Sequence, residues 1–338
     1  MNLIFTGGGT GGHLVIALSL AETARSHGHT VMFIGSTSGQ DRQWFANSTL
    51  FDEVHFLETT GVVNKSGFGK LGALWKVFKA LLKSRALIRS FHADAVVSVG
   101  GFSAAPASMA AVVSGTPLYI HEQNAVTGKL NRLLRPYAKR FFSSYEEGEN
   151  HCDYPVNARY FENARIRNSI KTVIFLGGSQ GAKFINDLAI EIAPWLQSGG
   201  IHIIHQCGLK EEERVRAAYH ELGIEAEVYG FTTQIAELCE RSDFAVSRSG
   251  ASTLWELCAA KIPAFFIPFP YAAADHQYHN ARYIIDHNAG WCERQSEGLI
   301  LKLQEAILSD IRAKSEALGK LIASNGAAHI IEKIEKDI

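Results

Sequence analysis

Residues 2–26 read NLIFTGGGTGGHLVIALSLAETARS, and this opening indicates the class of fold. Its first residues form a short apolar run of strand length, and residues 14–27 have a helix-like pattern. The glycines between the two let the backbone take positive φ and turn sharply. A buried strand that passes through a tight turn into a helix is typical of a βαβ unit, hence of a parallel sheet.

The same alternation continues through both halves of the chain. The strands that we expect are Leu3–Phe5, Thr30–Ile34, Ala95–Val99, Leu118–Ile120 and Arg140–Ser143 in the first half, and Thr172–Leu176, Ile201–His205, Ala226–Val228, Phe244–Val246 and Ala264–Ile267 in the second. Both halves open with a strand, a double glycine and a helix. We therefore predict an α/β protein of two Rossmann-like, doubly wound parallel-sheet domains that face each other across a cleft.

The length of 338 residues suits two domains. Residues 154–170 lack strong periodicity, so the domain boundary is expected there. We predict an N-terminal domain of residues 1–156 and a second domain of residues 157–316. A last helix, residues 317–338, is expected to pack back on the first domain.

Composition narrows the class of protein. The net charge of −1 gives no global basic excess of the kind that nucleic-acid binding needs, so no nucleic-acid partner is expected. The five cysteines are scattered and form no C-x-x-C pair, which indicates reduced core thiols and a cytoplasmic protein. The N-terminus shows no signal peptide, and the apolar stretch 104–120 is interrupted by prolines and a glycine. We expect a protein that touches a membrane at most.

Four turns that follow expected strands are rich in glycine or hydroxyl residues: GGGTGGH (7–13), GGFS (100–103), GGSQGAK (177–183) and SRSGASTLWE (247–256). Helix N-termini beyond such turns present free N–H groups to phosphate. None of the four matches a P-loop, and the strand that ends at Ile34 lacks the acid that a dinucleotide ribose needs, since Asp41 comes later. Glu256, one turn into its helix, either accepts hydrogen bonds from a ribose diol or complements the helix dipole.

The order of the motifs carries a family resemblance. GGTGGH (8–13), GGFS (100–103), HEQNA (121–125), GGSQGA (177–182), RSGA (248–251) and HQ (276–277) followed by NA (280–281) together resemble the MurG family of bacterial N-acetylglucosaminyltransferases, which have the GT-B fold. The resemblance implies an inverting transfer of N-acetylglucosamine from UDP-N-acetylglucosamine to the 4-hydroxyl of N-acetylmuramic acid in undecaprenyl-pyrophosphoryl-MurNAc-pentapeptide. This is the step from lipid I to lipid II in peptidoglycan synthesis.

The same resemblance implies a set of binding residues. Donor contacts are expected from Ser179, Phe231, Thr232, Ala251, Ser252, Thr253, Leu254, Glu256 and Gln277, and active-site contacts of the first domain from Thr10, Gly11, Gly12 and Asn124. His13 and Glu122 are two candidates for the catalytic base, and the sequence does not rank them. His13 has a side chain that titrates near neutral pH, but it could instead bond the turn. Glu122 could equally be a buried structural acid.

Two features bear on the leaving group. Asn157 stands where many relatives have an arginine that reaches the donor, and Arg159 follows two residues later, so the donor contact there is open. The chain has no D-x-D pair to hold a metal on the diphosphate, which agrees with neutralisation by helix N-termini. No cofactor is expected to be required, although an accessory divalent cation is compatible with this reading. No metal ligands are assigned, because His27, His29 and His55 lack ligand spacing and read as surface or satisfied polar residues.

The segment Lys70–Arg89 suggests a membrane contact. Leu71, Leu74, Trp75, Phe78, Leu81 and Leu82 follow helical spacing, and six basic residues accompany them without an acid. A basic amphipathic helix of this kind can lie on a membrane surface, but it can equally be a crossover helix that packs on the sheet. With a lipid-linked acceptor, we expect a peripheral protein on the cytoplasmic face of the inner membrane.

Other functions stay open at this point. A UDP-sugar 2-epimerase or a macrolide-type glycosyltransferase would share the fold. An NAD(P)-dependent oxidoreductase would use glycine loops differently and lacks its ribose acid here. A non-enzymatic scaffold has no need of matched glycine loops in both halves.

Overall fold

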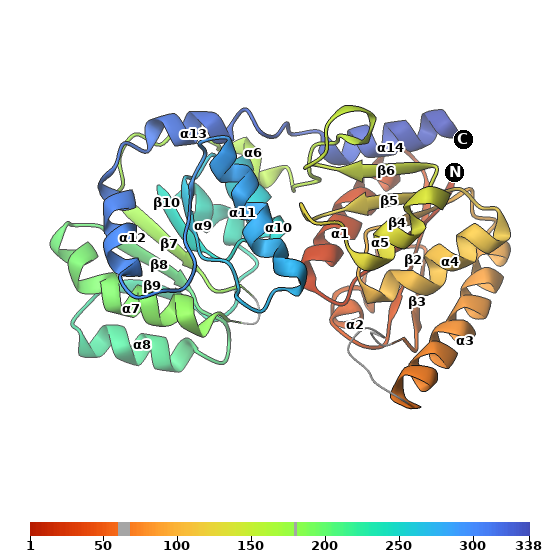
Figure 1. Cartoon of the computed structure of the whole chain (residues 1–338), viewed down its shortest axis with the longest axis horizontal. Helices are drawn as coiled ribbons and strands as arrows, with labels where there is room; N and C mark the ends of the chain where they lie inside the picture. Colours follow the sequence, from red (N-terminus) through yellow and green to blue (C-terminus); the bar gives the residue numbers. More distant parts are fainter. Residues whose placement is uncertain (60–67, 179–180) are drawn as a thin grey trace. The chain divides into compact units, whose positions relative to one another are not determined.

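The computed structural model describes residues 1–59, 68–178 and 181–338 (Figure 1). The chain divides into two compact units: unit 1 comprises Met1–Pro155 with Asn325–Ile338, and unit 2 comprises Val156–Ser324. Each unit holds one six-stranded sheet in which every pair of neighbouring strands is parallel. The predicted α/β class, with two Rossmann-like parallel sheets, is confirmed.

Unit 1 follows the doubly wound order β3-β2-β1-β4-β5-β6. Its strands are β1 (Asn2–Thr6), β2 (Thr30–Ser36), β3 (Glu53–Leu57), β4 (Ala95–Ser98), β5 (Leu118–Glu122) and β6 (Arg140–Ser143). Its helices are α1 (Gly11–Ser26), α2 (Asp41–Phe45), α3 (Phe68–Ser90), α4 (Ala105–Ser114), α5 (Lys129–Leu134) and α14 (Gly326–Asp337). The strand order reverses between β1 and β4, and ligands of such sheets bind beyond the carboxyl ends of the strands at this point.

The strands of unit 1 are almost continuously apolar because helices cover both faces of a parallel sheet. Ile4, Met32, Val96 and Ile120 occupy the middle of four adjacent strands and are fully buried in one cluster. The helix α3 runs beside α4 on the side of this core (Figure 1).

The C-terminal segment differs from the prediction of one helix over residues 317–338. Two helices are present, α13 (Arg312–Leu318) in unit 2 and α14 in unit 1. The Ser324-Asn325-Gly326 sequence between them favours a turn over a continuous helix. The helix α14 packs against α1, buries Ile330, Ile331 and Ile334, and therefore completes the core of unit 1.

Unit 2 has the strand order β12-β11-β10-β7-β8-β9. Its strands are β7 (Thr172–Leu176), β8 (His202–Gln206), β9 (Ala226–Tyr229), β10 (Phe244–Ser247), β11 (Ala264–Phe266) and β12 (Trp291–Cys292). Its helices are α6 (Arg159–Glu162), α7 (Lys183–Ser198), α8 (Glu212–Glu221), α9 (Ile235–Glu240), α10 (Ala251–Ala259), α11 (His276–Asp286), α12 (Leu299–Leu308) and α13. Here the order reverses between β7 and β10.

Two edge strands, β3 and β12, were not predicted from the sequence. Strand β3 alternates polar and apolar side chains and is only partly buried, and β12 is two residues long, so neither gives the apolar run by which the other strands were found. Among the residues that the structure describes, no helix is both long and apolar enough to span a bilayer.

Candidate active site

The glycine turns after β1 and β4 interlock at the switch point of unit 1. The N–H of Gly8 donates to the carbonyl of Gly100 at 3.1 Å. Gly9 and Gly101 both have positive φ, and a Cβ on either would collide, with the Phe102 ring in one case and the Gly8 carbonyl in the other. These glycines are therefore needed for two backbones to pass closely, as well as for the turns themselves.

Asp41, at the start of α2, accepts hydrogen bonds that fix the first glycine turn. Its buried carboxylate accepts the N–H of Gly9 at 2.6 Å and the N–H of Ser36 at 2.7 Å. Burial raises the pKa of Asp41, and the backbone hydrogen bonds partly offset this rise. The amides of Gly8 and Gly9 are thus bonded within the protein, so we no longer expect them to bind an anion. The sequence did not predict this role for Asp41, which was compared only with the acid that binds a dinucleotide ribose.

His13 lies in the first turn of α1 with both ring nitrogens engaged. Its Nδ1 is 2.9 Å from the Thr10 hydroxyl, and its Nε2 is 2.9 Å from the amide nitrogen of Gln123. Because the amide nitrogen of Gln123 can only donate, Nε2 carries the lone pair and Nδ1–H donates to Thr10. This arrangement fixes the neutral tautomer in which Nε2 can accept a proton. Gln123, which the sequence analysis did not single out, lies directly after β5.

Glu122, the other candidate base, accepts hydrogen bonds from residues of its own loop. Its carboxylate accepts hydrogen bonds from the N–H of Asn124 at 3.0 Å, the N–H of Gly128 at 2.9 Å and the Asn131 side chain at 2.8 Å. The side chain is almost fully buried. These three donors order the turn between β5 and α5, and with it the position of Asn124. The Glu122 carboxylate is therefore occupied by donors of its own loop, whereas Nε2 of His13 carries a lone pair.

His121 lies beside this group, in the interior of the domain. The ring is fully buried, and its centroid lies 5.6 Å from that of Tyr154 in an edge-on contact. Burial, assisted by neighbouring His13, lowers the pKa of His121 to about 3. The imidazole is accordingly neutral at physiological pH.

In unit 2, Gln206 ties together the turns that follow β7, β8 and β9. Its backbone carbonyl accepts the N–H of Gly177 at 2.8 Å, and its side chain donates to the carbonyls of Gly178 and Gly230 at 3.2 Å and 3.1 Å. Gly177 and Gly178 are thereby held where the strand order reverses. Ser179, predicted to contact the donor, lies outside the described residues.

The N-terminus of α10 begins directly beyond β10. Gly250 is the N-cap residue and has no side chain to cap the helix, and the first turn contains no acidic residue. Ala251, Ser252 and Thr253 form that first turn. Such a helix end carries a partial positive charge that suits a phosphate. Leu254, by contrast, is fully buried in the core, so its side chain is not available to a ligand.

Glu256 follows one turn later on α10 and is half-buried. Burial raises its pKa to about 7, and a hydrogen bond with the Tyr160 side chain partly opposes the rise. The carboxyl group is thus poised between its neutral and charged forms near neutral pH. Only the ionised form is a pure acceptor for the two hydroxyls of a ribose.

The remaining residues predicted to bind the donor lie after β9 and after β11. The side-chain oxygen of Gln277 accepts the N–H of Phe269 at 2.9 Å, which leaves its amide nitrogen as a donor. Thr232 accepts the N–H of Gln234 at 3.0 Å in the turn before α9, and adjacent Phe231 is exposed. Ala274, in the turn before α11, has a positive φ of 52°, a conformation that costs energy in a residue with a Cβ.

Two further observations concern charge near the donor residues. Arg248, directly after β10, donates to the carbonyls of Ile267 and Pro268 at 3.0 Å, and burial lowers its pKa to about 10, so it is charged at neutral pH. Asn157 accepts the N–H of Arg159 at 3.1 Å at the start of α6. The asparagine thus shapes the local backbone, and Arg248 is the cation nearest in sequence to the α10 end.

Comparisons with known proteins agree with this geometry. The family model for the glycosyltransferase family 28 N-terminal domain matches residues 3–143, and that for the family 28 C-terminal domain matches residues 172–336. The chain belongs to glycosyltransferase family 28. A family 28 enzyme transfers glycosyl groups, so the protein is a glycosyltransferase.

Curated relatives are similar over almost the whole chain. A protein of Sulfurimonas denitrificans is 54% identical over 334 residues, covering 99% of this chain and 98% of the relative. One of Campylobacter fetus is 48% identical over 335 residues, covering 99% of each. Both are named UDP-N-acetylglucosamine--N-acetylmuramyl-(pentapeptide) pyrophosphoryl-undecaprenol N-acetylglucosamine transferase.

Solved structures give the same fold. The crystal structure of MurG from Acinetobacter baumannii matches with a TM-score of 0.81 at 24% identity, over 99% of each chain. A glycosyltransferase of Streptomyces, SsfS6, matches with a TM-score of 0.67 at 15% identity, again over 99% of each. The family 28 chain therefore has the fold shared by these glycosyltransferases. The identity to the curated relatives confirms the resemblance to the MurG family seen in the sequence.

Proposed function

We propose that this family 28 enzyme transfers N-acetylglucosamine from UDP-N-acetylglucosamine to the muramyl sugar of undecaprenyl-pyrophosphoryl-MurNAc-pentapeptide. The observation that carries the proposal is the 54% identity, across nearly full length, to a relative named for this reaction. The candidate residues at both switch points support it, since each unit offers the group types that one side of such a reaction needs.

Unit 2 is the proposed donor side. The first turn of α10, with Ala251, Ser252 and Thr253, offers N–H groups and hydroxyls to the diphosphate. Glu256 would accept the ribose hydroxyls in its ionised form, and the amide nitrogen of Gln277 would donate to the sugar. Phe231 and Thr232 would frame the uracil, and Ser179 would contact the diphosphate, as the family resemblance implies. Leu254 would contribute only by packing α10 on the core.

Unit 1 is the proposed acceptor side, with His13 as the base. The acceptor hydroxyl would take the place of the Gln123 amide at Nε2, while Nδ1–H keeps its bond to Thr10. An imidazolium formed there would be stabilised by that bond, as expected of a general base. Gly11, Gly12 and Asn124 would line the acceptor beside it.

The chemistry is a single in-line displacement. The acceptor oxygen forms a bond to the anomeric carbon, and its proton passes to Nε2 of His13. The bond between the anomeric carbon and the β-phosphate oxygen breaks, and its electron pair leaves with UDP. The positive end of α10 and the Arg248 guanidinium would offset the charge that UDP gains, so the proposal needs no resident metal, although an accessory divalent cation would be compatible with it.

A lipid-linked acceptor requires contact with a membrane, and α3 is the proposed contact. Trp75, Phe78 and Leu82 are about half exposed, and the Trp75 and Phe78 rings stack at 5.6 Å. The exposed side chains of Lys76, Lys79 and Lys83 lie on the same helix.

A separate stripe of α3 faces the core. Ala80, Ser84 and Ile88 are buried there, so the helix packs on the domain and exposes a second apolar stripe with basic residues. The side chains of Leu71 and Leu74 lie outside the described set. We infer a peripheral position on the cytoplasmic membrane surface.

The direct test combines the purified chain with UDP-N-acetylglucosamine labelled in the sugar and a polyprenyl-pyrophosphoryl-muramyl-pentapeptide. We expect label in the lipid product and release of one UDP per transfer. A control reaction without acceptor detects epimerisation of the donor sugar. Transfer only to a non-lipid acceptor, or epimerisation without transfer, would refute the proposed reaction while leaving the family assignment intact.

A further inference from the structure

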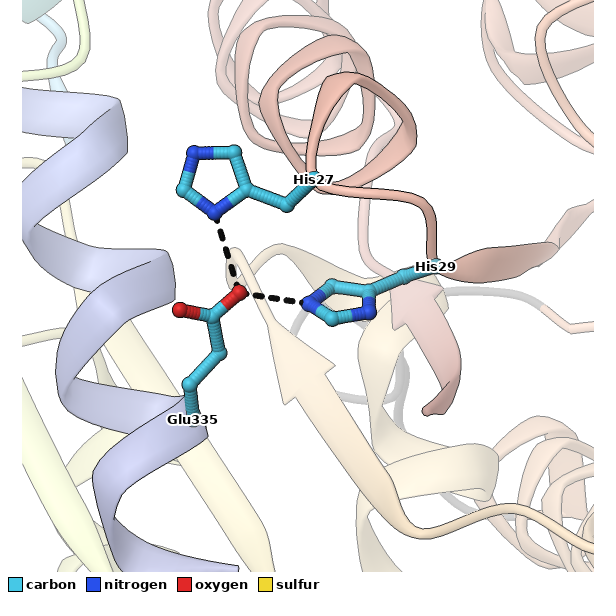
Figure 2. A group of neighbouring side chains, drawn as sticks. All are labelled: His27, His29 and Glu335. Carbon is cyan, nitrogen blue, oxygen red and sulfur yellow. Dashed lines mark hydrogen bonds and ion pairs between the residues drawn. The ribbon is translucent and has the colours of Figure 1, made fainter.

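Three side chains of unit 1 converge at the end of α1 opposite to His13 (Figure 2). His27 follows the last turn of α1, His29 precedes β2, and Glu335 comes from α14. His27 Nδ1 lies 2.9 Å and His29 Nε2 lies 2.7 Å from the same carboxylate oxygen of Glu335. Since α1 rises ~1.5 Å per residue, this cluster is roughly 20 Å from the candidate base.

Such convergence is unusual within the described part of the chain. Over residues 1–59, 68–178 and 181–338, it is the one group of three histidine, cysteine or acidic residues whose ligand atoms all lie within 4.8 Å of one another. No metal role was predicted for His27 and His29 because they lack ligand spacing, and the third member of the cluster, Glu335, lies 306 residues from His29. Only the return of α14 to unit 1 creates the cluster.

We propose that His27, His29 and Glu335 form a zinc site. Two imidazole nitrogens and one carboxylate oxygen are ligands that Zn²⁺ favours, with a fourth position left to water. Tetrahedral zinc with bonds of about 2.0–2.1 Å places its ligand atoms roughly 3.3 Å apart. The separations here, from 2.7 Å up to at most 4.8 Å, bracket that value.

The surroundings hold the ligands while leaving a path for the ion. The His29 side chain is only 11% exposed, and its Nε2 lies 2.7 Å from the Glu335 carboxylate, while the nitrogen of Met1 lies 3.3 Å from its Nδ1. The side chains of His27 and Glu335 are about one-third exposed, so the carboxylate edge of the cluster is open to solvent.

Bound zinc would connect α14 to two elements at the other end of the sequence. The helix is already attached by its buried isoleucines and by an ion pair between Asp337 and Arg140. A ligand that binds only the folded state stabilises that state in proportion to its concentration over Kd. Zinc should therefore raise the thermal stability of unit 1 through its C-terminal segment.

The test uses the full chain without a polyhistidine tag, freed of metal with a chelator and titrated with ZnCl₂ by calorimetry. The variants are H27N, H29N and E335Q, and the matched control is H55N. His55 forms a similar pair with Glu53 at 2.9 Å, but no third ligand joins them among the residues that the structure describes. H27N is the decisive variant, because the residue lies at a solvent-facing helix end where asparagine fits the turn.

We expect the parent and H55N to bind one equivalent of zinc more than H27N, H29N or E335Q, or to bind it about 100-fold or more tightly. Zinc should also raise Tm of the parent and H55N but not of the three ligand variants. Equal stoichiometry, affinity and Tm shift in the parent and in H27N, with H27N shown by circular dichroism to be folded, would overturn the site. The same holds if zinc binding falls equally in H55N. Glycosyl transfer does not enter any of these readouts.

Discussion

Glu122 and Glu256 show how one residue type takes different tasks in this enzyme. Three donors from its own loop satisfy the Glu122 carboxylate, whereas Glu256 on α10 lies in an environment that raises its pKa to about 7. The first carboxylate is engaged by donors of its own loop, whereas burial of the second favours its neutral form. Neither environment can be read from the sequence, because each depends on which groups surround the carboxylate in the folded chain.

Binding of UDP-N-acetylglucosamine should depend on pH through Glu256. Only the carboxylate accepts both ribose hydroxyls, so affinity should rise as pH increases through about 7, by roughly tenfold between pH 6 and pH 8 for a single site with that pKa. Calorimetric titration with the sugar nucleotide measures the effect, since its diphosphate diester does not titrate in this range. In Glu256→Gln the affinity should be low and independent of pH, and a parent-like pH profile in that variant would exclude the ribose role.

Glu122→Gln should affect stability before it affects chemistry. An amide group cannot accept all three hydrogen bonds, and a buried donor left without a partner costs about 1–3 kcal/mol. Chemical denaturation should show a loss of that size, while the pH profile of kcat keeps its shape. A variant of parental stability whose turnover has lost its pH dependence would instead make Glu122 the base.

Among the secondary-structure elements, the strands that are fully buried could be predicted from the sequence. Strands with both faces covered were found from their apolar runs, and α1 from its glycine turn and helical pattern. The edge strands β3 and β12 were missed because half-buried or two-residue strands leave no such run. The pattern of α3 was found, but only packing separates the residues that face the core from those that face solvent.

The exposed stripe of α3 should bind anionic membranes. Replacing Trp75, Phe78 and Leu82 with serine removes the half-exposed apolar residues that would enter the lipid interface. Co-sedimentation with vesicles containing anionic lipid should fall several-fold, with little change in Tm.

The matched control replaces Leu301 and Leu308 with serine. Both are exposed leucines on α12 of unit 2 and should leave vesicle binding unchanged. Equal losses in the two variants, or none in the α3 variant, would contradict a specific membrane contact by α3.

On the scale of the whole molecule, the two units have separate cores and separate proposed tasks. UDP binds to groups of unit 2 in this account, so it should stabilise that unit preferentially. Hydrogen exchange with saturating UDP should show added protection within residues 156–324, centred on α10 and the turn after β7. Protection concentrated in residues 1–155 would show that UDP binds unit 1, and it would contradict the proposed donor role of unit 2.

The candidate site was predicted in part. The glycine turns, His13 and Glu256 stand out because their residue types signal chemistry at strand ends. The supporting residues Asp41, Gln123 and Gln206 do not, since their role is to accept or donate specific hydrogen bonds across loops that lie apart in the sequence. Only the folded chain brings these partners together.

The division of tasks is tested most directly by steady-state transfer kinetics of His13→Ala and Glu256→Ala with lipid-linked acceptor. We expect His13→Ala to lower kcat by about 100-fold or more with KM for UDP-N-acetylglucosamine nearly unchanged, as removal of a general base requires. Glu256→Ala should mainly raise that KM. Parental kcat in folded His13→Ala, or an unchanged KM in Glu256→Ala, would contradict the central claim.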